Sequence, residues 1–126
     1  MKTQESAENY LETILILSQR LPAVRSIDIV NELNFSKPSV SVAMKNLRTK
    51  GLISVDSSGF IHLTPDGHMI ADTIYERHRL LSSWLIHLGV DEKTATEDAC
   101  RIEHVISPES FKAIKKHVTN HQPTQS

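Results

Sequence analysis

Apolar residues recur with helical spacing in the first part of the chain. Over residues 5–19 they form one stripe, with Glu5, Glu8 and other polar residues on the remaining surface, which predicts an amphipathic helix. Ser6 is expected to cap its start, and Leu21-Pro22 to end it, because a helical conformation is disfavoured immediately before a proline. The stripe consists of Tyr10, Leu11, Ile14, Leu15 and Leu17.

Two further helices are expected before residue 51. The first covers residues 26–33. The second runs from Ser36, a strong N-cap, to about Lys50, with Pro38 in its first turn, where a missing N–H costs little. Gly51 is placed to end it. Two helices joined by a tight turn, the second opening with small polar and basic residues, are typical of a helix-turn-helix.

Two short β-prone segments follow. Residues 52–55 and 60–63 are separated by Asp-Ser-Ser-Gly, in which Gly59 supplies the positive φ that a short hairpin needs. A hairpin directly after a recognition-type helix is a wing. The combination predicts a winged helix.

The remaining pattern is helical. Three helices are expected, over about residues 64–89, 91–106 and 107–118, and each begins with a capping residue or a proline. We therefore predict a mainly α protein with three parts.

The first part, residues 1–64, is a winged helix-turn-helix with three helices and a β-hairpin wing. The second, residues 65–120, is helical, and the third, residues 121–126, is a flexible tail. Met44 and Trp84 are expected in the core or in a subunit interface.

Composition narrows the class of protein. The 126 residues are 39% hydrophobic and 23% charged, as in ordinary globular chains. No apolar stretch approaches the roughly 18–20 residues that cross a bilayer, and the N-terminus lacks the apolar core of a secretory signal. One cysteine cannot form an internal disulfide and fits a reducing cytoplasm. Glycine-rich phosphate loops, nucleophile elbows and His-Glu-x-x-His are missing, so the sequence does not indicate an enzyme.

Charge is nearly balanced, with 14 basic and 15 acidic residues, but unevenly distributed. Residues 37–50 carry only basic charges, whereas residues 91–109 are mostly acidic. A basic segment suits a polyanion and an acidic segment suits cations, although two solvated helix faces would give the same pattern. The winged-helix pattern favours nucleic-acid binding, with protein contact as the alternative, because some winged helices serve only that purpose.

Cys100, Glu103 and His104 lie at i, i+3 and i+4 of one predicted helix and therefore share a face. Thiol, carboxylate and imidazole together suit divalent first-row transition metals. The alternative is a small buried cysteine beside a solvated Glu-His pair. Further ligands can come from Glu8, Asn9, Glu12 and His78.

Four segments carry a more specific signal: Glu8–Ile14, Ser36–Ser41, Arg77–Leu81 and Asp98–Ser107. In this order they resemble the first helix, the start of the recognition helix, the long linker helix and the metal-binding helix of the diphtheria-toxin-repressor family, which includes the manganese transport regulators. The resemblance covers about residues 5–118, and the chain corresponds to the short form without an SH3-like domain.

The resemblance implies a homodimeric, metal-activated transcriptional repressor of the cytoplasm. Its second part would then serve dimerisation and metal binding. Its expected partner is double-stranded DNA with a near-palindromic operator, and metal-uptake genes are the expected targets. No membrane contact and no small-molecule substrate are expected. The alternative is a metal-independent winged-helix regulator with a structural Cys/Glu/His cluster.

Carried over by position, the resemblance implies two groups of metal ligands. Asn9, Cys100, Glu103 and His104 fall on the primary site, and Glu12 and His78 on a second metal of the manganese type. Cys100 is the iron-type residue, since manganese-type members have a glutamate there. The expected cofactor is Fe²⁺ or Mn²⁺, with Co²⁺, Ni²⁺ or Zn²⁺ also binding in vitro.

The DNA contacts are expected on the recognition helix and the wing. Lys45, Ser36 and Ser39 would mostly contact phosphate, while Pro38, Ser39 and Val42 would lie against base edges or thymine methyls. The wing would touch the backbone or the minor groove. The full expected set is Ser26, Ser36, Lys37, Pro38, Ser39, Ser41, Val42, Lys45, Ser57 and Ser58.

Overall fold

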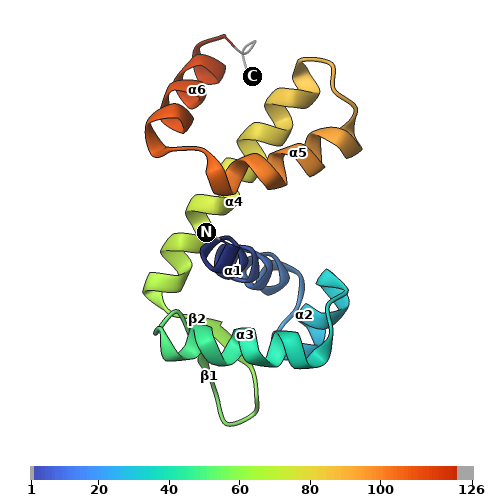
Figure 1. Cartoon of the computed structure of the whole chain (residues 1–126), viewed down its shortest axis with the longest axis vertical. Helices are drawn as coiled ribbons and strands as arrows, with labels where there is room; N and C mark the ends of the chain where they lie inside the picture. Colours follow the sequence, from blue (N-terminus) through green and yellow to red (C-terminus); the bar gives the residue numbers. More distant parts are fainter. Residues whose placement is uncertain (1, 122–126) are drawn as a thin grey trace. The chain divides into compact units, whose positions relative to one another are not determined.

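The computed structural model describes the backbone of residues 2–121 and the side chains of residues 5–119. Within this part of the chain, six helices and one two-stranded sheet follow one another (Figure 1). Their order is α1 (Lys2–Arg20), α2 (Ser26–Leu33), α3 (Lys37–Thr49), β1 (Ile53–Val55), β2 (Ile61–Leu63), α4 (Pro65–His87), α5 (Glu92–Val105) and α6 (Pro108–His121). The predicted mainly α class is confirmed, and residues 122–126 of the predicted tail lie outside the described residues.

The chain divides into two compact units, one up to Thr73 and one from Ile74 onward. The predicted domain boundary at residue 64 coincides with the end of β2 and the start of α4. The first turns of α4 belong to the first unit because Gly67 packs against the backbone of Leu52. The division into functional domains stays a prediction.

The first unit is the predicted winged helix. Helix α1 packs on α2, α3 and β2, and α3 packs on β1 (Figure 1). The loop of the hairpin projects beyond α3, away from α1. The antiparallel strands pair Ile53 with Leu63 and Val55 with Ile61. The core contains Leu11, Ile14, Ile29, Val40, Leu47, Ile53 and Ile61, all buried.

The local signals around α3 and in the hairpin loop act as predicted. Ser36 caps α3, and Asn34 in the preceding turn adopts the left-handed conformation with φ 57°. Gly51, after α3, has φ 76°, and Gly59, in the hairpin loop, has φ 85°. These residues set the turns around the recognition helix.

The predicted cap at Ser6 is wrong. Helix α1 begins at Lys2, so Ser6 lies inside the helix. Lys, Gln and Glu are good helix formers, and Glu5 in the first turn interacts favourably with the positive end of the helix dipole. The chain therefore enters the helix before it reaches the capping residue.

In the second unit, the later part of α4 packs with α5 and α6. The buried centre consists of Leu81, Ala99 and Phe111, with Trp84 half-buried against it. Asp91 caps α5 by accepting a hydrogen bond from the Thr94 amide, which lowers the pKa of its carboxyl below the ordinary 3.8. None of the described helices is long and apolar enough to cross a membrane.

Candidate DNA interface and metal centre

The recognition helix α3 presents a polar and basic surface. All ten residues expected to contact DNA are exposed, including Lys37 and Lys45 of α3 and Ser57 and Ser58 of the hairpin loop. Val42 is 60% exposed although it is apolar. An exposed valine beside lysines and hydroxyls suits a surface that meets thymine methyl groups and phosphates.

The two serines at the start of α3 have different hydrogen bonds. The Ser36 hydroxyl accepts from the Ser39 amide at 3.2 Å and donates to the Ser39 hydroxyl at 2.9 Å. Its only proton is used within the protein. The Ser39 hydroxyl accepts that bond and keeps its own proton for another acceptor.

A single carboxylate organises the wing loop. Asp56 Oδ1 accepts from the amides of Ser58 at 2.9 Å and Phe60 at 3.0 Å, and Oδ2 lies 3.0 Å from His62 Nε2. The hydrogen bond from His62, followed by that from the Phe60 amide, lowers the pKa of Asp56 below its ordinary 3.8. An Asp followed by Ser-Ser-Gly is a recognisable signal for such a turn.

The wing is also tied to the start of α2. The Ile61 amide donates to the Val24 carbonyl at 2.8 Å. The Arg25 guanidinium lies 4.7 Å from the centre of the Phe60 ring, a distance typical of a cation–π contact. These two contacts orient the hairpin within the first unit.

Cys100, Glu103 and His104 meet on one face of α5. Their ligand atoms all lie within 4.8 Å of one another. Glu103 is completely buried, the His104 side chain is 3% exposed and Cys100 is exposed. The predicted i, i+3 and i+4 spacing on one helix therefore brings a thiol, a carboxylate and an imidazole into one cluster.

The Glu103 carboxylate lies between two histidines. His78 Nδ1 of α4 lies 2.8 Å from Oε1, and His104 Nε2 lies 3.3 Å from Oε2. When His78 Nδ1 donates in this contact, Nε2 of the same ring remains available to another partner. The predicted ligand His78 thus reaches the cluster from a second helix.

These residues fit a transition-metal ion. Glu103 Oε2 is buried and accepts no hydrogen bond from any group in the described part of the chain. A buried carboxylate oxygen is costly unless a cation or a donor compensates its charge. The S/O/N donor set is that of Fe²⁺, Co²⁺, Ni²⁺ or Zn²⁺ sites. The other two predicted ligands, Asn9 and Glu12, lie on α1 in the first unit, and their role as ligands stays a prediction.

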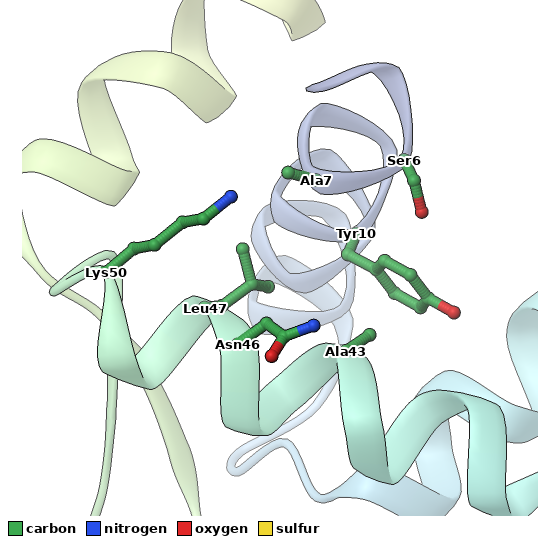
Figure 2. Close-up of a pocket in the computed structure, with 7 residues that line it drawn as sticks. All are labelled: Ser6, Ala7, Tyr10, Ala43, Asn46, Leu47 and Lys50. Atoms are coloured by element: carbon green, nitrogen blue, oxygen red, sulfur yellow. The ribbon is translucent and has the colours of Figure 1, made fainter. Parts of the chain in front are cut away.

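A hollow of about 310 Å³ lies between α1 and α3 (Figure 2). The Asn46 and Lys50 side chains reach from the end of α3 toward α1, where Ser6 and Tyr10 lie. Burial raises the pKa of Tyr10 above its ordinary 10.0, so its hydroxyl remains a donor at neutral pH. Among the residues whose side chains the structure describes, no Cys, His or carboxylate lines this hollow, so its chemistry differs from that of the α5 cluster.

A winged helix joined to a cluster of side chains that could hold a transition metal is typical of DNA-binding regulators that respond to metals. Two family models match the chain: "Iron dependent repressor, N-terminal DNA binding domain" over residues 2–68, and "Iron dependent repressor, metal binding and dimerisation domain" over residues 64–124. The chain belongs to the iron-dependent repressor family. It is a transcriptional regulator and not an enzyme.

Individual relatives agree with this assignment. The chain is 31% identical over 118 residues to the transcriptional regulator MntR of Escherichia coli O6:H1. The matched residues cover 94% of this chain and 76% of MntR. It is 31% identical over 113 residues to the diphtheria toxin repressor of Corynebacterium diphtheriae, covering 89% of this chain and 50% of that protein.

Solved structures share the fold. The structure of the manganese regulator SloR superposes with a TM-score of 0.80 at 29% identity, covering 90% of this chain and 53% of the SloR chain. The metal-dependent transcriptional regulator MtsR gives a TM-score of 0.84 at 25% identity, covering 90% of this chain. The chain therefore spans about half the length of these solved chains.

Proposed function

We propose that this regulator represses transcription as a homodimer that binds a near-palindromic operator when Fe²⁺ or Mn²⁺ is bound. The observation that carries the proposal is the buried Glu103 carboxylate, held between a thiol and two imidazoles with one oxygen lacking a donor. Its place of action would be the cytoplasm, because an operator-binding protein works where the chromosome is.

Cys100, Glu103 and His104 would hold the metal. Asn9 and Glu12, one turn apart on α1, and His78 on α4 would supply further oxygen and nitrogen ligands. A bound divalent ion supplies positive charge and a fixed coordination geometry to these side chains. Ligands drawn from both α1 and α5 would hold the DNA-reading unit and the second unit in one arrangement. Metal affinity and operator affinity would then increase each other by the same factor.

The recognition helix would enter the major groove, and the wing would lie on the backbone or in the minor groove. Lys37, Lys45 and the Ser39 hydroxyl would contact phosphate, and Val42 would lie against thymine methyls. The two recognition helices of a dimer would reach successive major grooves. This arrangement requires an operator with approximate twofold symmetry.

The choice of metal rests on Cys100. A thiolate is a softer ligand than a carboxylate and favours Fe²⁺ over Mn²⁺. The similar structure SloR is described as a manganese regulator, and MntR simply as a transcriptional regulator. The matching family models are named for iron. We propose Fe²⁺ as the better activator, and competition between the two ions for the purified protein under anaerobic conditions tests this.

The central experiment is a fluorescence-anisotropy titration of duplex DNA selected from a random-sequence pool by the metal-loaded protein. We expect Fe²⁺ or Mn²⁺ to tighten binding by about 10–100-fold relative to chelator, the range typical of coupling between two sites. Equal affinity in metal and in chelator would support a metal-independent winged-helix regulator instead.

Two variants test the ligand assignment. Glu103→Gln and His104→Ala should bind DNA in metal only as weakly as the wild type does in chelator, while sedimentation still shows a dimer. Glu97→Gln is the matched control, because Glu97 is an exposed glutamate on the same helix. Glu97→Gln should keep the full metal response; a normal response in Glu103→Gln and His104→Ala would reject the site.

A further inference from the structure

Arg77 of α4 holds the end of the helix that carries the metal ligands. Its Nη1 donates to the carbonyl oxygens of Glu103 and Ile106, at 3.1 Å each. Glu103 is itself a proposed metal ligand, and His104 is the next residue. One guanidinium nitrogen therefore connects α4 to the last turn of α5 and to the residue that follows it.

The two carbonyls need an external donor. Helix α5 ends at Val105, so the amide four residues after Glu103, which would pair with its carbonyl inside a helix, belongs to residue 107 beyond the helix end. Ile106 itself already lies outside the helix. Carbonyls at a helix end lack intrahelical amide partners, and a positive charge near them is favourable. The Arg77 guanidinium supplies both the donor and the positive charge. The last turn of α5 is thereby fixed in the conformation that aims Glu103 and His104.

The guanidinium is held in place by a third element. It lies 5.6 Å from the centre of the Phe111 ring on α6. Its Nε is buried and has no hydrogen-bond partner in the described part of the chain. A buried donor without a partner destabilises the folded protein. A side chain that only filled space would not need to carry such a group, whereas a guanidinium whose Nη1 donates to both carbonyls necessarily carries it.

We propose that Arg77 is a positioning residue for the metal centre: it sets the geometry of Glu103 and His104 without being a ligand. The proposal rests on the metal-dependent function given above. Together with His78, which contacts the Glu103 carboxylate, Arg77 constrains this glutamate at both its backbone and its side chain. A carboxylate constrained in this way loses less freedom when it binds an ion, and contacts behind the ligands typically contribute 10–100-fold to metal affinity.

The test is a titration of Arg77→Met and Arg77→Lys with Co²⁺ by absorption and with Mn²⁺ by calorimetry. Met removes both hydrogen bonds to the carbonyls, and we expect Arg77→Met to weaken Co²⁺ binding by about 10–100-fold. Arg77→Lys keeps a positive charge near the helix end but not the planar guanidinium. Its Co²⁺ affinity should therefore lie between that of Arg77→Met and that of the wild type. Arg101→Lys is the matched control, since Arg101 lies on α5 with a side chain 77% exposed and should bind like wild type.

The Co²⁺ spectrum separates a positioning role from a purely structural one. The sulfur-to-metal band of Cys100 should persist in Arg77→Met, while the ligand-field bands change as Glu103 and His104 lose their fixed orientation. A purely structural role would lower the midpoint of thermal unfolding and leave the affinity and the spectrum of the folded protein unchanged. That result would overturn the proposal.

A measurement on the wild type covers the case in which Arg77→Met does not fold. In metal-free protein labelled with ¹⁵N-arginine, the Nη protons of Arg77 should exchange with solvent much more slowly than those of Arg101. Equal exchange would also overturn the proposal. If the wild type itself binds neither Co²⁺ nor Mn²⁺, the proposed function fails; if it binds and Arg77→Met binds equally well, only the role of Arg77 fails.

Discussion

At the scale of single residues, Ser36 and Ser39 divide two tasks that the sequence alone does not separate. Both are exposed serines in one turn, and both are expected to contact phosphate. The Ser36 hydroxyl caps α3 and donates its proton to Ser39, whereas the Ser39 proton remains for an acceptor outside. We therefore expect Ser36 to contribute mainly to stability and Ser39 mainly to DNA binding.

Alanine substitutions test this division. Ser36→Ala should reduce the free energy of unfolding by about 1 kcal/mol, the usual contribution of an N-cap. Ser39→Ala should leave it nearly unchanged and weaken binding to the selected DNA. Urea denaturation and anisotropy, measured on both variants, check the two effects. The division is wrong if Ser39→Ala proves the more destabilising of the two.

Gly67 is required by a close approach between two backbones. A Cβ at this position would lie 1.9 Å from the carbonyl oxygen of Leu52, which cannot move without disturbing the turn after α3. We expect Gly67→Ala to reduce the free energy of unfolding by about 1–3 kcal/mol, although alanine favours helices. Met69→Ala, two residues away and 67% exposed, is the control and should change the free energy of unfolding by less than about 0.5 kcal/mol.

At the scale of elements, the hairpin is short, with three residues in each strand, and its loop is shaped by the Asp56 carboxylate. The lowered pKa of Asp56 means that the folded loop favours the ionised form. The stability that the ionised Asp56 contributes is fully present above pH 3.8, the ordinary pKa of the group. It is lost as the pH falls through the lower pKa that Asp56 has in the folded protein. The wing should therefore keep its conformation throughout the neutral range.

An NMR titration of the DNA-free protein checks this sign. The amide shifts of Ser58 and Phe60 should titrate together, with a midpoint below 3.8, because both amides donate to the same oxygen. Asp56→Asn keeps an oxygen acceptor but removes the ionisation, so the shared titration should vanish. A midpoint at or above 3.8 in the wild type would show that the carboxylate is not held as described.

Most elements were predictable because their signals are local. The N-caps Ser36 and Asp91, the proline in α3 and the glycines with positive φ mark boundaries through contacts within a few residues. The start of α1 was not predictable in this way, since helix formers ahead of Ser6 extend the helix without a distinctive cap. The same locality made the cluster of Cys100, Glu103 and His104 readable from spacing.

At the scale of the whole molecule, the second unit exposes large apolar side chains that a dimer would cover. Ile86 and Leu88, at the end of α4, are 43% and 62% exposed, and Val105 on α5 is 77% exposed. Isolated apolar side chains on a surface are common, but this unit matches a dimerisation domain. We infer that Ile86 and Leu88 belong to the dimer contact.

The double variant Ile86→Asp/Leu88→Asp tests the dimer. Burying each side chain contributes about 1.5–3 kcal/mol, so two charges at these positions should raise the dissociation constant of the dimer about 100-fold or more. Sedimentation measures the mass, and circular dichroism should show unchanged helix content. Met69→Asp, which changes an apolar residue of the first unit that is 67% exposed, should leave the dimer intact. A double variant that remains fully dimeric would place the contact elsewhere.

The sequence alone determined the order of helices, the hairpin, the polar and basic face of α3 and the clustering of three side chains on α5, because each depends on spacing and capping over a few neighbouring residues. Only the tertiary structure decided that His78 meets the Glu103 carboxylate, that Arg77 takes the carbonyls at the end of α5, and that Arg25 covers Phe60. These contacts join residues 25 to 35 positions apart. They depend on which helix faces pack together, and that choice is made by buried area summed over many side chains rather than by any short motif.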